Sequence, residues 1–217
     1  MNFGYIDMQS KAGLFSIKPK VYSFETGRLL YIFPAISKEA KLNKITKKYD
    51  VQLIPQKVNH EFKERIYIKI ILQVLKETDT KNITFSFENA EDNLELLIYF
   101  FKREIPFVIT DSLNADKVCD FFLDKFGHPV TVVSRVRSGL FVYEGGNFPA
   151  INLSVIKLDL AGNLPGEKII VNEYNLKNIN FPIKINSIAL LNSVLTLTGK
   201  EISDIIIKPC IIRVADE

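Results

Sequence analysis

The stretch "NITFSFENAEDNLELLIYFF", residues 82–101, decides the predicted fold because it reads as a strand, a turn and a helix in direct succession. Asn89 is the expected N-cap of that helix, since its side-chain oxygen can accept a hydrogen bond from an unpaired backbone amide. A helical stripe of apolar residues follows, formed by Leu94, Leu97, Ile98 and Phe101. This strand–turn–helix unit is one repeat of an α/β fold.

The same alternation of apolar strands and helices continues on both sides of this stretch. Five apolar runs, "RLLYIF", "VQLI", "NITFSF", "IPFVITD" and "PVTVVS", are separated by four segments with helical periodicity. Because the runs show almost no polar alternation, they predict parallel strands that are buried on both faces. Right-handed crossovers then favour a doubly wound sheet with helices on both faces.

We therefore predict an α/β fold with a mostly parallel, five-stranded sheet over residues 28–137. This region resembles doubly wound Rossmann-like domains, which implies ligand binding beyond the carboxyl ends of the strands. The strand order, Rossmann-like or flavodoxin-like, stays open. Phe101 and Phe122 should be buried, because each lies in the apolar stripe of its helix.

Two flanking regions complete the predicted domain organisation. Residues 1–27 are expected to form a hairpin or a covering β segment on the main body. Residues 138–217 are expected to form a β-rich α+β region with one helix that ends at Gly199. Within it, the Gly-Gly and Pro-Gly pairs are typical of turns between antiparallel strands, and Pro209 suggests an edge strand or a bulge.

The composition excludes several classes of protein. The chain has 28 basic and 25 acidic residues, and a formal charge of +3 is too small for general nucleic-acid binding. No apolar run approaches the ~18 residues of a membrane helix and no secretory signal is visible, so we expect a cytoplasmic protein. The two cysteines, Cys119 and Cys210, are expected to be buried thiols, since they cannot form a disulfide framework or a complete zinc site.

Polar side chains at the predicted strand ends are the candidate ligand-binding residues. In open parallel sheets ligands bind beyond the carboxyl ends of the strands, where helix N-termini also point. The candidates at these junctions are Ser37, His60, Glu88, Asn89, Asp111, Ser112, Ser134 and Arg135.

The turn "ENAED", residues 88–92, carries three carboxylates and no glycine, so a dinucleotide pyrophosphate would meet like charge there. Asp111 lies where a ribose-binding acid falls in dinucleotide folds, but the glycine fingerprint is missing. Glu88 and Asp111 are an alternative pair for a hard cation such as Mg²⁺. In the simpler alternative, Glu91 and Asp92 complement the helix dipole and no metal binds.

Three further features have a functional and a structural interpretation. His60 is either an acid or base in the crevice or an exposed residue at a helix end. Ser134, Arg135 and Arg137 are either an anion clamp or ordinary surface residues at a strand end. The segment "VYEGGNFP", residues 142–149, is either a mobile flap over the crevice or a hairpin turn.

These residues favour a noncatalytic or regulatory α/β domain that binds a small anionic ligand or a protein partner. An enzyme that acts on a nucleotide or phosphorylated metabolite in the crevice is the first alternative. A structural assembly subunit, including a homo-oligomer, is the second. No motif names a cofactor, which stays unknown, and no metal or membrane partner is expected.

Overall fold

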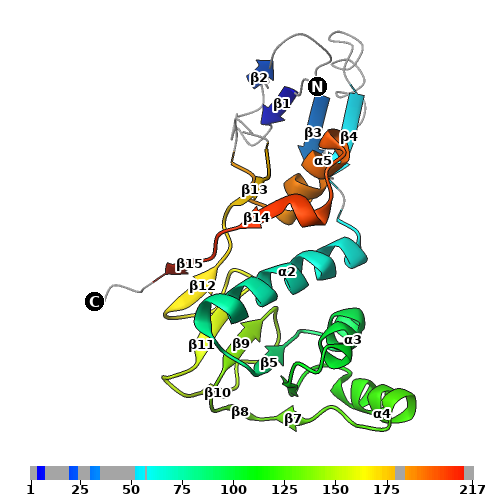
Figure 1. Cartoon of the computed structure of the whole chain (residues 1–217), viewed down its shortest axis with the longest axis vertical. Coiled ribbons are helices and arrows are strands. Elements are labelled where there is room, and N and C mark those ends of the chain that lie inside the picture. Colours follow the sequence, from blue (N-terminus) through cyan, green and yellow to red (C-terminus); the bar gives the residue numbers. More distant parts are fainter. Residues whose placement is uncertain are drawn as a thin grey trace, which may run out of the picture. The chain divides into compact units, whose positions relative to one another are not determined.

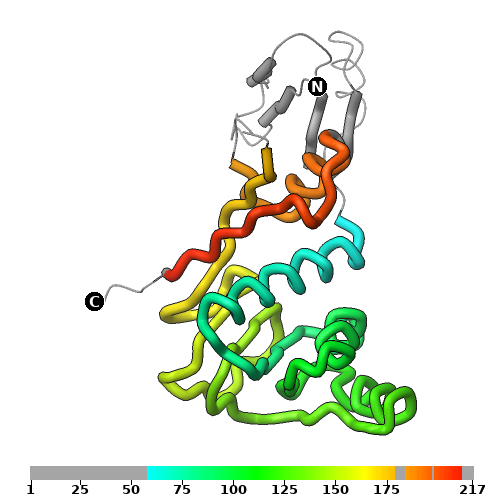
Figure 2. Tube along the Cα trace, in the orientation of Figure 1, coloured from blue at the N-terminus to red at the C-terminus, as the bar shows by residue number. Residues whose placement is uncertain are grey.

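The computed structural model describes residues 58–178 and 184–212, together with the backbone of four short N-terminal strands. The chain divides into two compact units, drawn in Figures 1 and 2. The first unit comprises residues 1–59 and 175–205. The second, called the sheet unit below, comprises residues 60–174 and 206–217. No described helix is long and apolar enough to cross a membrane.

The described part of the first unit includes two small sheets and the helix α5. Strands β1 (Gly4–Asp7) and β2 (Lys20–Ser23) pair antiparallel, as a hairpin requires. Strands β3 (Leu30–Pro34) and β4 (Gln52–Gln56) pair parallel, and helix α5 (Ile188–Thr198) packs against β4. Helix α5 ends at Gly199, which has a left-handed φ of +63°. The helix predicted at 37–49 lies outside the described residues.

The sheet unit is built on a seven-stranded sheet in the order β15-β12-β11-β9-β5-β6-β7. All neighbouring pairs are parallel except β12 and β15, which are antiparallel. The strands are β5 (Ile83–Ser86), β6 (Phe107–Thr110), β7 (Val132–Val133), β9 (Leu140–Tyr143), β11 (Ile156–Asp159), β12 (Lys168–Ile170) and β15 (Cys210–Ile212). The chain leaves the unit after β12 and returns at β15 (Figure 2).

The prediction of a mostly parallel sheet was right, but the strands assigned to that sheet were partly wrong. Strands β3 and β4 do not join β5, β6 and β7, whereas β9, β11 and β12 from beyond residue 137 do. The prediction of antiparallel turns at the Gly-Gly and Pro-Gly pairs was also wrong, because β9, β11 and β12 are parallel. Their connections are short and lack a helix, so in sequence they resemble hairpin loops.

Three helices of the sheet unit form one layer, and they follow one another in a row in Figure 1. They are α2 (His60–Thr78), α3 (Leu94–Lys102) and α4 (Ala115–Phe126). Ring contacts join α3 and α4 to one face of the sheet: the centroid distance is 5.6 Å for Phe85–Phe100 and 6.1 Å for Phe107–Phe122. Helix α2 packs against α3.

The opposite face of the sheet is covered differently. Phe141 and Tyr143 of β9 point to this face and pack with Val136, Val155 and Leu164. These partners come from the connections between strands, which contain the short pair β8 (Arg135–Val136) and β10 (Ala150–Ile151). No helix among residues 134–174 packs there, so the expectation of helices on both faces was wrong. Over β6 and β7 this face stays partly open, since Val108 and Val133 are only half-buried there.

Burial confirms the helical periodicity of α2 and α4, but of the predicted α3 stripe only Leu97 is buried, and Leu94, Ile98 and Phe101 are half-buried. Phe122 is fully buried, as are Ile66, Ile70 and Val74 of α2. Phe101 is only half-buried, because the buried positions of α3 are Leu96, Leu97 and Phe100. A 3₁₀ turn, η1 (Glu91–Asn93), precedes α3 and shifts the inner face of the helix. The two thiols also differ from expectation, since Cys119 is half-buried and Cys210, on the edge strand, is exposed.

Candidate functional site

The carboxyl ends of β5 and β9 mark the point where the connections of the sheet diverge. From β5 the chain continues to β6 on one side, and from β9 it continues to β11 on the other. In parallel sheets a ligand crevice forms at such a point. We call this place the switch crevice. Strand β5 ends there at Ser86 and is followed by Glu88 and Asn89. Strand β9 ends there at Tyr143 and is followed by Glu144.

The loop after β9 fills the switch crevice. The Ser86 hydroxyl donates to the carbonyls of Gly145 and Asn147, at 3.1 and 3.3 Å, and the Tyr143 hydroxyl donates to Gly146 at 3.2 Å. A Cβ on Gly146 would lie 2.2 Å from the Phe87 carbonyl oxygen, so only glycine permits this approach. The segment predicted as a flap or a hairpin turn is therefore a parallel crossover that packs on the end of β5.

A buried carboxylate takes the position at the α3 N-terminus where a bound anion would accept hydrogen bonds. The backbone amide of Leu96 donates to Oε1 of Glu64 at 3.2 Å, and Glu64 is only 4% exposed. Its Oε2 lies 3.3 Å from Nδ1 of His60. Burial raises the pKa of the Glu64 carboxyl, although the Leu96 amide and His60 act to lower it. The helix terminus is thus capped from within the protein.

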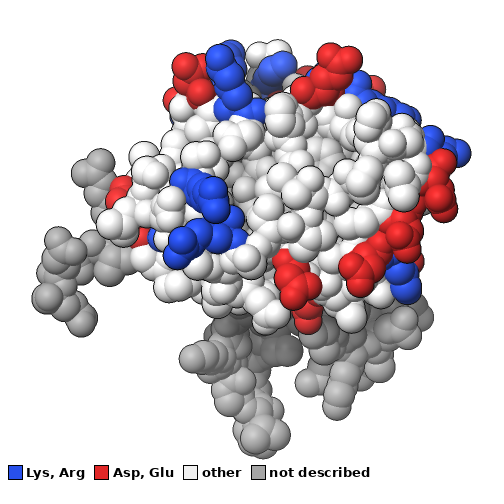
Figure 3. Space-filling view, turned by 90° about the horizontal axis from the view of Figure 1, so that it is seen from below, with Lys and Arg blue, Asp and Glu red and all other residues white. Residues whose placement is uncertain are grey.

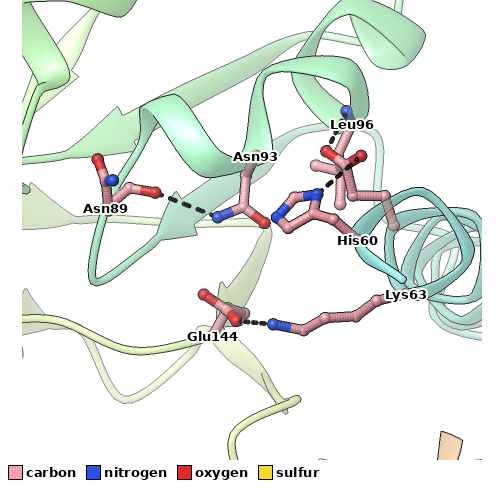
Figure 4. A network of polar contacts seen from close by, with 7 residues as sticks. His60, Lys63, Asn89, Asn93, Leu96 and Glu144 are labelled. Carbon is pink, nitrogen blue, oxygen red and sulfur yellow. Dashed lines mark hydrogen bonds and ion pairs between the residues drawn. The ribbon is translucent and has the colours of Figure 1, made fainter. Parts of the chain in front are cut away.

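The lysine of the crevice is also paired within the protein. Figure 4 shows Lys63 extending toward Glu144, and its Nζ lies 2.5 Å from the Glu144 Oε1 atom. The same Nζ is 5.2 Å from the centroid of the Tyr67 ring, within reach of a cation–π contact. Burial raises the pKa of Tyr67, and the charge of Glu144 acts in the same direction. A ligand anion would have to displace Glu144 to reach this cation.

The acidic turn is held by three asparagines. Oδ1 of Asn89 accepts hydrogen bonds from Asn114 Nδ2 at 3.0 Å and from the Glu91 amide at 3.3 Å. Asn93 donates to the Asn89 carbonyl at 3.2 Å and lies between Asn89 and His60 in Figure 4. The prediction that Asn89 is the N-cap of α3 was wrong, because Asn93 holds that position. Asn89 instead links the turn after β5 to the turn after β6. The turn is thus held by hydrogen bonds of asparagine side chains, whereas phosphate-binding turns depend on glycines.

Glu88 follows β5 at the switch crevice, but the remaining predicted site residues do not gather there. Ser37 lies outside the described residues. Glu88 and Asp111 are exposed at neighbouring strand ends, and no described cluster of three acids, histidines or cysteines is suited to hold a metal. The hydroxyl of Ser112 is buried without a hydrogen-bond partner, as is that of Thr110. His60, 52% exposed at its side chain, borders a mixed-charge pocket between α2 and α3.

Ser134 and Arg135 instead line a groove on the open face of the sheet. This arginine groove encloses about 470 Å³ and is bordered by the connection from β7 to β9 and by β5, β6 and β7. Its lining residues are Asn82, Thr84, Val108, Val132, Val133, Ser134, Arg135, Arg137 and Ser138. No acid is among them. Arg135 and Arg137 are exposed, and no acidic side chain of residues 58–178 or 184–212 pairs with either.

Basic and acidic side chains both occur on the surface seen from below (Figure 3). One group of basic side chains lies on the left and several acidic side chains lie on the right, while both kinds occur along the upper edge. Gly139, with a φ of +87°, brings the end of the connection against Asn82, whose carbonyl accepts the Leu140 amide at 3.0 Å. This contact closes one end of the groove. Ser134 and Arg135 were predicted as site residues because they follow a strand. Asn82, Thr84 and Ser138 also line the groove but were not predicted, since they do not lie at the carboxyl end of a predicted strand.

No family model, curated protein or solved structure matches this chain.

Proposed function

We propose that the sheet unit is a noncatalytic, Rossmann-type domain that binds a small anion in the arginine groove. The strand order supports the fold type, because numbering β5, β6, β7, β9, β11 and β12 from one to six gives 3-2-1-4-5-6 across the sheet. That is the Rossmann order, whereas a flavodoxin-like sheet has the order 2-1-3-4-5. The edge strand β15 adds an antiparallel neighbour to this arrangement.

The polar side chains of the switch crevice are paired with other groups of the protein, which supports a noncatalytic role. Catalysis by acid–base or nucleophilic groups needs a side chain that is free to contact substrate. Here Lys63 is paired with Glu144, Glu64 caps α3, and the Ser86 hydroxyl is bonded to the Gly-Gly loop. A nucleotide phosphate in this crevice would find the α3 N-terminus occupied by the Glu64 carboxylate and Lys63 occupied by the Glu144 carboxylate.

The arginine groove carries the proposal, because it brings together two arginines that have no acidic partner among the residues that the structure describes. Arg135 and Arg137 are two positions apart on one extended segment, so their side chains leave it on the same side. Guanidinium groups bind oxyanions with paired hydrogen bonds, and the hydroxyls of Ser134 and Ser138 add donors. A tetrahedral oxyanion fits this donor set.

Calorimetric titration with inorganic phosphate at low ionic strength tests the proposal. We expect saturable binding that weakens about 10- to 100-fold in Arg135→Gln and in Arg137→Gln, the loss of one charged hydrogen bond of ~1.5–3 kcal/mol. Arg65→Gln is the matched control, since Arg65 is exposed, pairs with Glu61 and lies outside the groove. Unchanged phosphate affinity in both groove variants would refute the proposal.

Titration with nucleotides and sedimentation velocity distinguish the two alternative functions from the proposed one. An enzyme acting on a nucleotide in the switch crevice would bind nucleotides with an affinity that depends on Lys63 and not on Arg135. An assembly subunit would bind neither phosphate nor nucleotides, and its sedimentation coefficient would rise with protein concentration.

A further inference from the structure

We infer that the anion of the arginine groove is a phosphomonoester with a flat apolar body, an inference that rests on the proposed function. The groove has two chemically different walls. One wall is the connection from β7 to β9, with Ser134, Arg135, Arg137 and Ser138. The other is the sheet itself, with the valines of β6 and β7 beside Thr84. A ligand that fills both needs a charged end and an apolar end.

The size of the groove excludes a bare oxyanion as its complete ligand. Its volume of about 470 Å³ falls within the ~300–1,000 Å³ of pockets that hold small organic molecules. Water occupies ~30 Å³ per molecule in the liquid, so an inorganic phosphate would leave most of the groove filled with solvent. Room therefore remains for a body attached to the phosphate.

The sheet wall is suited to a flat apolar body. Val108 and Val133 are both half-buried, although valines of a parallel sheet are normally covered on both faces. The register sets Val108 beside Thr84 and Val133 beside Thr110, so the side chains of Thr84, Val108 and Val133 share this face of the sheet and form one wall. Covering it with a ring removes apolar area from water, which adds to the affinity of the anionic end.

Charge selects a phosphomonoester among organic anions. The ester carries about −1.5 to −2 charges at pH 7, which matches two guanidinium groups. A carboxylate, a sulfate ester or a phosphodiester carries a single negative charge and leaves one cation uncompensated. The three terminal oxygens of the phosphate also provide enough acceptors for both arginines and a serine hydroxyl.

Titration of the full chain with phenyl phosphate, methyl phosphate and phenyl sulfate tests each part of the inference. We expect phenyl phosphate to bind at least about 10-fold more tightly than methyl phosphate. Phenyl sulfate, with the same ring and one charge fewer, should bind more weakly than phenyl phosphate. Lowering the pH from 7 to 5 should weaken phenyl phosphate, since its second pKa lies near ~6.

Two variants separate this inference from the proposed function. Val133→Ser should abolish the advantage of the ring and leave the affinity for methyl phosphate unchanged, while Arg135→Gln should weaken both esters. Equal affinities of the wild type for the two esters would overturn the inference and leave anion binding intact. Absence of binding by all three compounds and by inorganic phosphate would overturn both. Melting temperatures of the variants should match the wild type, which excludes misfolding as the cause.

Discussion

At the scale of single residues, Glu64 and Glu144 occupy the positions that a ligand's anionic groups would take in the switch crevice. Glu64 accepts the Leu96 amide at the α3 N-terminus, and Glu144 pairs with Lys63. Neither contact has a signal in the sequence, because Lys63 and Glu144 are 81 residues apart. The turn "ENAED" lacks glycines because the protein's own carboxylates and amides hold this junction, and no backbone has to approach a phosphate.

Glu64→Gln should become more stable relative to the wild type as the pH rises. Burial raises the pKa of Glu64 in the folded protein above its ordinary 4.5, so the stability linked to its protonated form is present below 4.5 and is lost as the pH rises through the folded pKa. Glutamine keeps an oxygen for the Leu96 amide and carries no charge. Urea unfolding between pH 4 and 7 measures the difference.

Glu61→Gln is the control for this pH series, because Glu61 lies on the same helix turn and its side chain is 75% exposed. An equal trend in both variants would show that burial is not the cause. A wild type that gains stability over Glu64→Gln with rising pH would show that the ionised cap of α3 outweighs its desolvation.

Gly146→Ala should destabilise the protein more than Gly162→Ala. Both glycines have a φ of +86°, which costs a residue with a Cβ ~1–2 kcal/mol. An added Cβ meets the Phe87 carbonyl oxygen in the first case and nothing within 4 Å in the second. Denaturant unfolding of the pair therefore isolates the close approach of the loop to β5. Equal losses would mean that the loop can move away from the strand without cost.

At the scale of elements, aromatic rings hold the layer of α3 and α4 on the sheet. Phe122 contacts Phe101, Phe107 and Phe126, with centroid distances of 5.3, 6.1 and 5.3 Å. Phe101 also contacts Phe126 at 4.6 Å but remains half-buried between the two helices. The rings thus differ in burial although both belong to predicted apolar stripes.

Phe122→Ala should cost ~3–5 kcal/mol of unfolding free energy, since the ring is fully buried and a cavity remains. Phe101→Ala should cost clearly less, because part of its ring already contacts solvent. Chemical denaturation of the two variants in parallel gives the comparison. Similar losses would imply that the helix layer depends on ring contacts and not on the area buried.

At the scale of the whole molecule, the sequence predicted where strands and helices lie better than it predicted which strands pair with each other. The apolar runs at β5, β6 and β7 and the helical stripe of α2 identified real elements, and β5 pairs parallel with β6 as expected. An apolar run does not reveal its partner, so β3 and β4 were assigned to the wrong sheet. The helix-free connections after β9 and β11 could not be told from hairpins, because their glycines suit both.

The candidate site was predictable only in part for the same reason. Ser134 and Arg135 were chosen because they follow a strand, and they do line a groove. The groove lies on a face of the sheet that the prediction had covered with helices. Its walls depend on which strands are neighbours, and this information is spread over residues 82–138.

The late return of β15 to the sheet has a consequence for synthesis on the ribosome. Strand β12 pairs with β15, and the whole of residues 175–205 lies between them in the chain. While that segment is being translated, β12 has no β15 beside it and presents an open row of amides and carbonyls. At ~5–20 residues per second this interval lasts a few seconds, long enough for chaperones or another nascent chain to contact the unpaired strand.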